Sequence, residues 1–394
     1  MSKLDTKPYK GTRDFYPEDL RLRDYIFSKW REVCQSFGYE EYDASAIESM
    51  ELYTAKTSEE IVGEQTFSFE DRGGRKVTLR PEMTPTASRM VAARRQELGY
   101  PLRLFSIPNC FRYERMQRGR TREFWQLNAD LFGVDGIEAD LEMILIADRI
   151  MESFGAQPES YEIQVNSRKL TSWLLEEYFK VPADNTAAVM RLIDAQEKME
   201  PAKFKDALNE AMGEAEGIQL SSWLEKNSSL DDLPAGAPTG DIKQVIERAE
   251  ASSVNNVRWH LGLARGFDYY TDLVFEVFDT NPDNNRSMFG GGRYDGLVGE
   301  FGVEPIPTVG FAAGDITMQN FLESNHLVPE LPTENNVYLM VEEGKQAEAQ
   351  AYAQELRAEG QNVAVDLSGR KRDKQFKAAK KLGFTEDKIQ WFEG

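Results

Sequence analysis

The chain has 394 residues and a formal net charge of −20, and 41% of its residues are hydrophobic. This length predicts more than one domain, and the acidic excess excludes a protein that coats nucleic acid over its whole surface. Two cysteines (Cys34, Cys110) and two histidines (His260, His326) exclude a disulfide framework and a multi-histidine metal site, and favour a reducing, cytoplasmic setting. The N-terminus does not resemble a signal peptide and no run is apolar enough to span a bilayer, so no membrane association is expected.

The first half of the chain alternates between helical and strand patterns. Its first element is an amphipathic helix, because apolar residues recur on one face at helical spacing and Gly38 is placed to end it. The Asp71–Gly74 segment is a hairpin turn signal between two strands. The elements expected up to residue 165 are helix 17–37, strands 65–71 and 76–80, helices 84–97 and 141–154, and strand 161–165.

Residues 168–253 differ in character, because they are helix-rich and heavily charged. We interpret them as an inserted helical module; the alternative, a helical stretch of the same core, stays open. Strands are expected again at 257–263 and 273–278, followed by a glycine-rich turn at 289–296 and a helix ending near Ser324. Strands without regular helix alternation predict an α+β fold, with an antiparallel sheet and helices on one side.

Prolines 329 and 332 mark a linker, after which strands and helices alternate. This pattern predicts a small, mostly parallel α/β domain over residues 333–394. Its expected elements are strand 337–341, helix 345–359, strand 362–366, helix 373–382 and strand 389–392.

A cationic segment interrupts the acidic chain between two predicted strands. Five arginines fall within eleven residues: Arg112, Arg115, Arg118, Arg120 and Arg122. After them, Phe124, Gln126, Asn128 and Asp130 alternate with apolar residues, as in a strand. The planar guanidinium binds phosphate through two hydrogen bonds, so an arginine-rich hairpin tip suits a phosphate ligand. The alternative is a solvated loop that the acidic surface balances.

Three further segments carry candidate ligand groups. Glu82 and Thr84 offer a carboxylate and a hydroxyl to an ammonium group, although both are also common at helix N-termini. In the segment 263–271, Arg265 suits an anion and Tyr269 and Tyr270 suit a polar ligand. The glycines at 290–292 allow close approach of backbone to a ligand, and a turn between strands explains them equally well.

Together these segments resemble the histidyl-tRNA synthetases, a family of class II aminoacyl-tRNA synthetases. The resemblance begins at Gly11-Thr-Arg-Asp-Phe-Tyr-Pro and runs over essentially the whole chain. Residues 265–271 and 290–297 resemble the two peptides peculiar to the histidine enzyme. Residues 109–133 resemble the second class motif and residues 310–314 the third. The implied domains are a discontinuous catalytic domain (1–167 and 254–327), the inserted module (168–253) and an anticodon-binding-like domain (333–394) that looks shortened.

The resemblance implies a role for each matching residue. Glu82 and Thr84 would hold the histidine amino group, and Met83 would be among the histidine-binding residues. Gln126 and Arg112 would bind the substrate, and Arg112 would also contact the α-phosphate of ATP. Asp130 and Tyr270 would read the imidazole nitrogens, with Tyr269 beside them. Arg265 resembles the family's catalytic arginine, which acts where other class II enzymes place a metal ion. The remaining residues implied in nucleotide or RNA contacts are Arg115, Arg118, Arg120 and Arg122 in the hairpin, and Arg370, Lys371, Arg372, Lys374, Lys377, Lys380 and Lys381 near the C-terminus.

The implied reaction joins histidine to tRNA(His) in two steps. The histidine carboxylate attacks the α-phosphorus of ATP, and the terminal ribose of the tRNA then attacks the activated carbonyl. Such a reaction needs fixed geometry and positive charge rather than a nucleophilic side chain. Mg²⁺ would bridge the ATP phosphates, with no protein ligand firmly assigned. A homodimer and a cytoplasmic location follow from the same resemblance.

The sequence departs from the family pattern at three positions. Thr317 stands where the third motif usually carries an arginine that stacks on adenine. Ser45 lies near a usual proline of the first motif, and Asp130 replaces the commoner glutamate. These departures keep an alternative open, a non-catalytic paralogue that binds histidine as a regulatory subunit of ATP phosphoribosyltransferase. Arg265 and the C-terminal domain favour the ligase, because such paralogues generally lack both.

Overall fold

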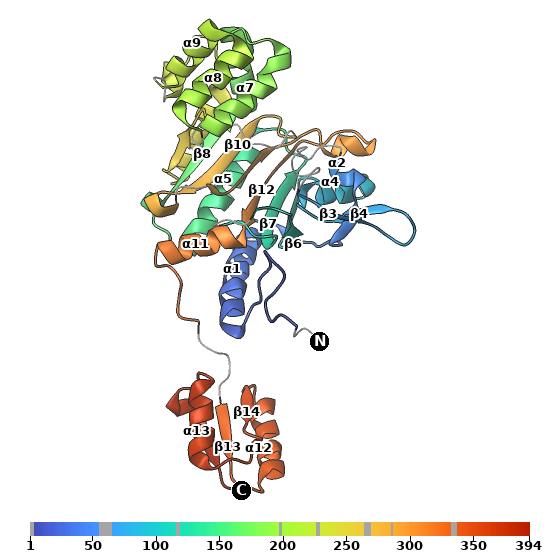
Figure 1. Cartoon of the computed structure of the whole chain (residues 1–394), viewed down its shortest axis with the longest axis vertical. Coiled ribbons are helices and arrows are strands. Elements are labelled where there is room, and N and C mark those ends of the chain that lie inside the picture. Colours follow the sequence, from blue (N-terminus) through green and yellow to red (C-terminus); the bar gives the residue numbers. More distant parts are fainter. Residues whose placement is uncertain are drawn as a thin grey trace. The chain divides into compact units, whose positions relative to one another are not determined.

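The computed structural model describes residues 4–54, 65–115, 119–196, 199–225, 229–263, 269–284, 287–331 and 337–394. The chain divides into two compact units, Met1–Val328 and Pro329–Gly394 (Figure 1). No described helix is long and apolar enough to cross a membrane.

A mixed sheet forms the centre of the first unit. All of its strand pairs are antiparallel except β1–β5 and β8–β9. β6 (Asn109–Phe111) pairs with β7 beside the main path. The strand order is β1 (Glu40–Glu41), β5 (Leu102–Ser106), β7 (Glu123–Phe132), β12 (Thr308–Gly314), β11 (Ser287–Arg293), β10 (Leu273–Asp279), β8 (Tyr161–Ser167) and β9 (Val257–Trp259). This largely antiparallel sheet with flanking helices confirms the predicted α+β fold.

One face of the sheet packs against helices α1 (Pro17–Ser36), α5 (Ile137–Ser153) and α11 (Asp315–Ser324) (Figure 1). The predicted N-terminal helix is confirmed: Trp30 is fully buried and Gly38 follows the helix end with a φ of +81°. A left-handed φ of this kind is comfortable only for glycine.

The alternation of residues along β7 separates the two faces of the sheet. Leu127, Ala129 and Leu131 are buried in the core shared with α1 and α5. Gln126 and Asn128 point to the opposite face, where a cavity lies. The period-two pattern of the sequence therefore distinguishes core from cavity.

A small antiparallel sheet stands beside the main one. It has the order β2 (Ile47–Ser49), β4 (Lys76–Leu79) and β3 (Phe67–Glu70), with α2 (Glu51–Thr54) and α4 (Thr84–Ala93) close by. The predicted hairpin turn is confirmed, because the Asp71 carboxylate accepts hydrogen bonds from the backbone N–H groups of Gly73 and Arg75.

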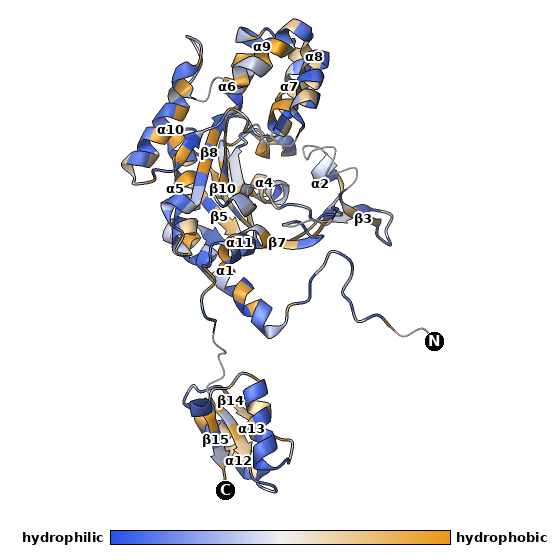
Figure 2. Cartoon of the chain, turned by 60° about the vertical axis from the view of Figure 1, so that its left-hand side comes forward, coloured by the Kyte–Doolittle hydropathy of each residue, from blue (hydrophilic) through white to orange (hydrophobic). Residues whose placement is uncertain are grey.

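Helices connect β8 to β9. They are α6 (Arg168–Trp173) with a π-helical turn at Leu174–Tyr178, α7 (Ala183–Ala195), α8 (Pro201–Met212), α9 (Glu214–Leu224) and α10 (Gly240–Ala251). α7, α8 and α9 pack around a core of their own, beyond the ends of β8 and β10 (Figure 1). α10 instead buries Ile242, Val245 and Ala249 in the main core and alternates hydrophobic with hydrophilic residues along its length (Figure 2). The domain boundaries at 168 and 253 stay a prediction.

The glycine triplet lies inside strand β11, so its prediction as a turn is wrong. Gly290 pairs with Glu276 on one side and Ala312 on the other. A Cβ on Gly291 would lie 2.0 Å from the Gly310 carbonyl oxygen. Tight strand packing, rather than a reversal of the chain, explains the glycines. Strand β9 is also shorter than predicted, ending at Trp259.

The second unit has its own cores on the two faces of a parallel sheet. β13 (Val337–Val341) lies between β14 (Val363–Val365) and β15 (Ile389–Phe392). α12 (Gln346–Ala358) and α13 (Arg372–Lys381) complete the unit, as predicted. The described 3₁₀ turns of the chain are Pro158–Ser160, Leu230–Asp232, Pro282–Asn284, Val298–Phe301 and Glu386–Lys388.

Candidate active site

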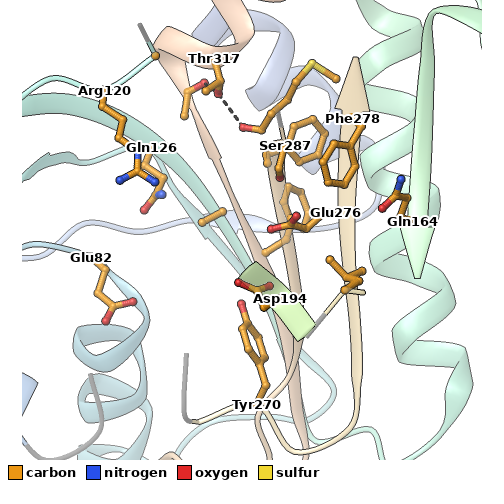
Figure 3. A pocket seen from close by; sticks show the side chains of 18 of the residues that line it. Glu82, Arg120, Gln126, Gln164, Asp194, Tyr270, Glu276, Phe278, Ser287 and Thr317 are labelled. Atoms are coloured by element: carbon orange, nitrogen blue, oxygen red, sulfur yellow. Dashed lines mark hydrogen bonds between the residues drawn. The ribbon is translucent and has the colours of Figure 1, made fainter. Parts of the chain in front are cut away.

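A cavity of about 1170 Å³ lies on the face of the main sheet opposite α1 and α5 (Figure 3). Its floor is a row of residues in register across five strands, with small residues in the middle and polar side chains at both ends. The row runs Asn128, Ala312, Gly290, Glu276 and Gln164. The two small central residues leave backbone exposed to a ligand.

Glu82 and Thr84 meet the cavity at the start of α4. The Glu82 carboxylate is buried and accepts a hydrogen bond from the Tyr269 hydroxyl at 3.2 Å. Met83, predicted beside them, is fully buried and lies outside the cavity lining. A buried carboxylate next to a hydroxyl is suited to an ammonium group, because a buried charge needs a partner.

Asp130 lies behind the cavity wall rather than on it. Its Oδ1 accepts a hydrogen bond from the Tyr294 hydroxyl, and Tyr294 lines the cavity. Its Oδ2 is buried and has no hydrogen-bond partner among the described residues. Burial raises the pKa of the Asp130 carboxyl to about 7, and the hydrogen bond from Tyr294 opposes this rise.

Three tyrosines form the wall next to this carboxylate. The ring centroids of Tyr269 and Tyr270 are 5.0 Å apart, and those of Tyr269 and Tyr294 are 5.7 Å apart. Burial and the neighbouring Asp130 raise the pKa of Tyr294 well above its usual value, so its hydroxyl stays protonated. This wall combines an apolar surface with hydroxyl groups, as a polar aromatic ligand requires.

The arginine hairpin supplies the cationic wall. Arg112 donates through Nε to the Pro81 carbonyl at 2.9 Å, and its guanidinium lies 5.3 Å from the Phe124 ring centroid. Arg120 reaches the same cavity and pairs with Glu114 at 3.1 Å. Glu114 also lies 4.0 Å from Arg112, so one carboxylate holds both guanidinium groups near the cavity.

The other predicted arginines are placed differently. Arg122 stacks 3.7 Å from the Tyr113 ring centroid and bonds to the Tyr9 hydroxyl, outside the cavity lining. Arg115 is exposed and is also absent from the lining. Arg118 and Arg265 lie outside the described residues, so their predicted roles stay predictions.

The third-motif segment closes one end of the cavity. Thr317 donates to the Met288 carbonyl at 2.7 Å, as Figure 3 shows, and faces the cavity together with Asn320. Asp315 at the start of α11 is buried and also lines the cavity. Burial raises the pKa of Asp315, whereas the Arg13 guanidinium opposes the rise.

The far side of the cavity includes residues that the sequence did not single out. Gln164 of β8 and Glu276 of β10 lie on the floor, and Asp194 and Gln196 at the end of α7 reach the same space (Figure 3). His260, just after β9, also lines it. The alternation Phe275–Glu276–Val277 indicates that Glu276 faces away from the core. No local sequence pattern indicates that the residues of α7 line the cavity.

The cavity therefore brings together predicted residues from three separate stretches of chain. These are Glu82, Thr84, Arg112, Arg120, Gln126, Tyr269 and Tyr270. A largely antiparallel sheet with guanidinium groups and a large polar cavity on one face is typical of the class II aminoacyl-tRNA synthetase fold.

Comparison with known proteins identifies the family. A family model described as histidyl-tRNA synthetase matches residues 11–315. The histidine–tRNA ligase of Leptospira biflexa is 41% identical over 389 residues, covering 97% of this chain and 89% of that protein. That of Haloarcula marismortui is 38% identical over 371 residues, covering 92% and 85%. The chain belongs to the histidyl-tRNA synthetase family, which confirms the resemblance.

Solved structures agree on the fold. A histidyl-tRNA synthetase from Nostoc sp. PCC 7120 matches with a TM-score of 0.79 at 23% identity, covering 97% of this chain and 90% of that one. A Bacillus halodurans protein described as an ATP phosphoribosyltransferase regulatory subunit/histidyl-tRNA synthetase matches with a TM-score of 0.78 at 22% identity, covering 99% and 98%. At these identities the likeness concerns the fold alone.

Proposed function

We propose that the chain is a histidine–tRNA ligase that activates histidine with ATP and transfers it to the 3′ end of tRNA(His). One observation carries the proposal: within a chain of this family, one cavity joins Glu82, Arg112, Gln126 and Tyr270. These groups suit the ammonium, carboxylate and imidazole of histidine together with a phosphate.

Histidine recognition is supported by the unsatisfied acceptor of Asp130. Because Asp130 lies behind the cavity wall, we assign its Oδ2 to an imidazole N–H that enters between the tyrosines, and the hydroxyl of Tyr270 to the other ring nitrogen. A site built to hydrogen-bond a ligand in this way can reject an apolar isostere by roughly 10⁴–10⁵, because the site groups would be left unpaired. Glu82 and Thr84 would hold the amino group.

ATP is assigned to the end of the cavity between the arginine hairpin and α11. Arg112 would neutralise charge at the α-phosphate and Arg120 at the outer phosphates, and Arg265 would complete the cationic set. Removing one such charge-stabilising donor typically lowers the rate about 10²–10³-fold. Among the described residues no group of three or more His, Cys, Asp or Glu side chains could hold a metal. Mg²⁺ would therefore bind mainly through the ATP phosphates and water.

The tRNA end is assigned to the far side of the cavity, under α7. Gln164, Gln196 and His260 present hydrogen-bonding groups there. The basic run of α13 is assigned to RNA contact in the second unit. A homodimer in the cytoplasm completes the proposal.

Histidine-dependent exchange of labelled pyrophosphate into ATP tests the activity. Exchange is expected with histidine and with no other amino acid, and Arg112→Ala is expected to lower it about 10²-fold or more. Arg31→Ala is the control, because Arg31 of α1 pairs with Glu41 of β1 and neither residue lines the cavity. A wild-type protein without exchange would favour the regulatory paralogue.

Arg265→Ala tests the assigned catalytic arginine. Adenylate formation is expected to collapse while histidine binding, measured by calorimetry, survives. Retained turnover contradicts the role.

A further inference from the structure

The N-terminal segment Tyr9–Phe15 contacts both walls of the nucleotide end of the cavity. We call it the N-terminal brace. It precedes α1 and lines no part of the cavity itself. Its contacts, which involve residues at the start of the stretch that resembles the family, form two separate sets.

The first set joins the brace to α11. Arg13 Nη2 lies 2.6 Å from Asp315 Oδ2, and Asp315 Oδ1 accepts a hydrogen bond from the Trp125 backbone N–H at 3.0 Å. The Asp315 side chain is only 4% exposed and the Arg13 side chain 24%. One buried carboxylate thus ties β7 to the first residue of α11, and Arg13 supplies its counter-charge.

Loss of that counter-charge has a local consequence. A buried carboxylate without a partner must take up a proton or move toward water. Either change weakens the link from Asp315 to Trp125. Because Asp315, Thr317 and Asn320 share the start of α11 and all line the cavity, the wall that they form would shift.

The second set joins the brace to the arginine hairpin. The Gly11 carbonyl accepts from the Arg122 N–H at 2.7 Å, and the Arg122 carbonyl accepts from the Arg112 N–H at 3.0 Å. Gly11 has a φ of +90°, and a Cβ there would lie 2.6 Å from Arg122 Cγ. Only glycine suits this left-handed, closely packed position. The backbone path from Gly11 reaches Arg112 through two hydrogen bonds.

We propose that the N-terminal brace positions the nucleotide-binding end of the cavity, with Arg13 acting through Asp315 and Gly11 acting through Arg122. The two contact sets hold two parts of the cavity wall, the hairpin and α11, at a fixed separation. Arg13 is a positioning residue and does not touch substrate. The inference rests on the proposed function, because it assumes that ATP binds between these walls.

Steady-state pyrophosphate exchange on the full chain separates the two substrates. Arg13→Ala is expected to raise the KM for ATP or lower kcat by about 10–10²-fold, the usual cost of a displacement near 1 Å. The KM for histidine should stay within about twofold, since Glu82 and Tyr270 lie at the other end of the cavity (Figure 3). Arg13→Lys should recover part of the loss.

Arg23→Ala is the matched control. The Arg23 side chain is 22% exposed, close to the value for Arg13, and its guanidinium lies 4.8 Å from the Trp125 ring centroid. Like Arg13, it also lies 4.9 Å from the Phe15 ring centroid, so the control shares the aromatic contact with the brace and lacks only the ion pair to α11. Its ion pair is with Asp24, not Asp315. The KM for ATP should therefore remain near that of the wild type.

A double-mutant cycle with Asp315→Asn tests the route. If Arg13 acts through Asp315, Arg13→Ala should cost much less in the Asp315→Asn background than in the wild type. Equal losses in both backgrounds, or equal rises in the KM values for ATP and histidine, overturn the inference.

Calorimetric titration with ATP separates this inference from the proposed function. A wild-type chain that binds ATP without histidine-dependent exchange refutes the ligase assignment alone. An ATP affinity and a kcat that both stay at their wild-type values in Arg13→Ala refute the positioning role alone.

Discussion

At the residue scale, Asp130 shows how burial sets the proton affinity of a group that is proposed to recognise the imidazole. The carboxyl is 2% exposed and has a pKa of about 7 against an ordinary value of 3.8. Between about pH 4 and pH 7 the folded state holds a proton that the unfolded state has lost. Folding stability from this group therefore falls as the pH rises through that window, and it is fully retained only below it.

Replacing Asp130 by asparagine should remove this dependence. Wild type should lose roughly 2–4 kcal/mol of unfolding free energy from this group between pH 4 and pH 7, at 1.36 kcal/mol for each pKa unit. The Asp130→Asn variant should lose correspondingly less. Urea denaturation at several pH values measures both slopes, and other buried carboxyls such as Asp140 contribute equally to the two proteins.

Tyr294→Phe provides the complementary control. The hydroxyl lowers the pKa of Asp130, so its removal should raise that pKa further and extend the loss of stability to higher pH. Identical pH profiles for all three proteins would show that Asp130 is not the titrating group.

The residue types at the site were largely predictable, but their partners were not. Local motifs singled out Glu82, Arg112 and Gln126. The pairing of Asp130 with Tyr294 joins residues 164 positions apart, and no local pattern reports such a contact. The burial that shifts the pKa of Asp130 arises from tertiary packing, which the sequence pattern does not display.

At the element scale, the glycine strand β11 decides how closely its neighbours pack. A Cβ on Gly290 would lie 2.2 Å from the Phe275 carbonyl oxygen, and one on Gly291 would lie 2.0 Å from that of Gly310. Both obstacles are backbone atoms, which cannot rotate away as a side chain can. The triplet therefore sets the spacing of β10, β11 and β12.

Gly291→Ala should consequently destabilise the first unit strongly, by about 2–3 kcal/mol or more, as expected for overpacking against backbone. Gly296→Ala is the matched control, because a Cβ there meets nothing within 4 Å. The control should remain within about 0.5 kcal/mol of wild type. Thermal and urea unfolding decide the matter, and equal stabilities of the two variants would contradict the packing argument.

Element boundaries followed from periodicity where one face is buried. The spacing of apolar residues predicted which side of β7 and which side of α1 are buried. The glycine strand was not, because a residue without a side chain contributes nothing to such a pattern. Consecutive glycines are also typical of a turn. Only the pairing with the neighbouring strands shows that these glycines lie in a strand.

At the scale of the whole molecule, positive charge gathers on α13 in the second unit although the chain is acidic overall. Lys371, Lys374 and Lys377 are exposed, and Arg372 lies 5.1 Å from the Trp391 ring centroid. Arg372, Lys377 and Trp391 line a second cavity of about 450 Å³. Cationic groups beside a half-buried indole suit a single-stranded nucleic acid, through phosphate contacts and base stacking.

Changing Lys371, Lys374 and Lys377 to alanine should weaken tRNA binding and flatten its salt dependence. Each lost phosphate contact should reduce the slope of log K against log salt by about 0.7–0.9. Titrations at several salt concentrations measure the slope. Lys345→Ala is the control, because Lys345 bonds to Glu348 at the start of α12. A slope that matches the wild type would remove these lysines from the RNA interface.

The alternation of strands and helices beyond residue 336 made the second unit predictable almost element by element. The contribution of helix α7 to the lining of the main cavity could not be predicted from the sequence. Asp194 and Gln196, at the end of α7, line this cavity. The position of α7 depends on the separate helical core that contains Phe204 and Leu208, and no local sequence pattern reports such packing.

The floor of the main cavity limits how its specificity can change. Gly290 at its centre has no atoms left to remove, and Ala312 has only a methyl group. Substitution can make the centre of this floor shallower but hardly deeper. A chain that evolves or is engineered toward a bulkier amino acid must therefore gain its room at the rim, from the tyrosines and the end of α7.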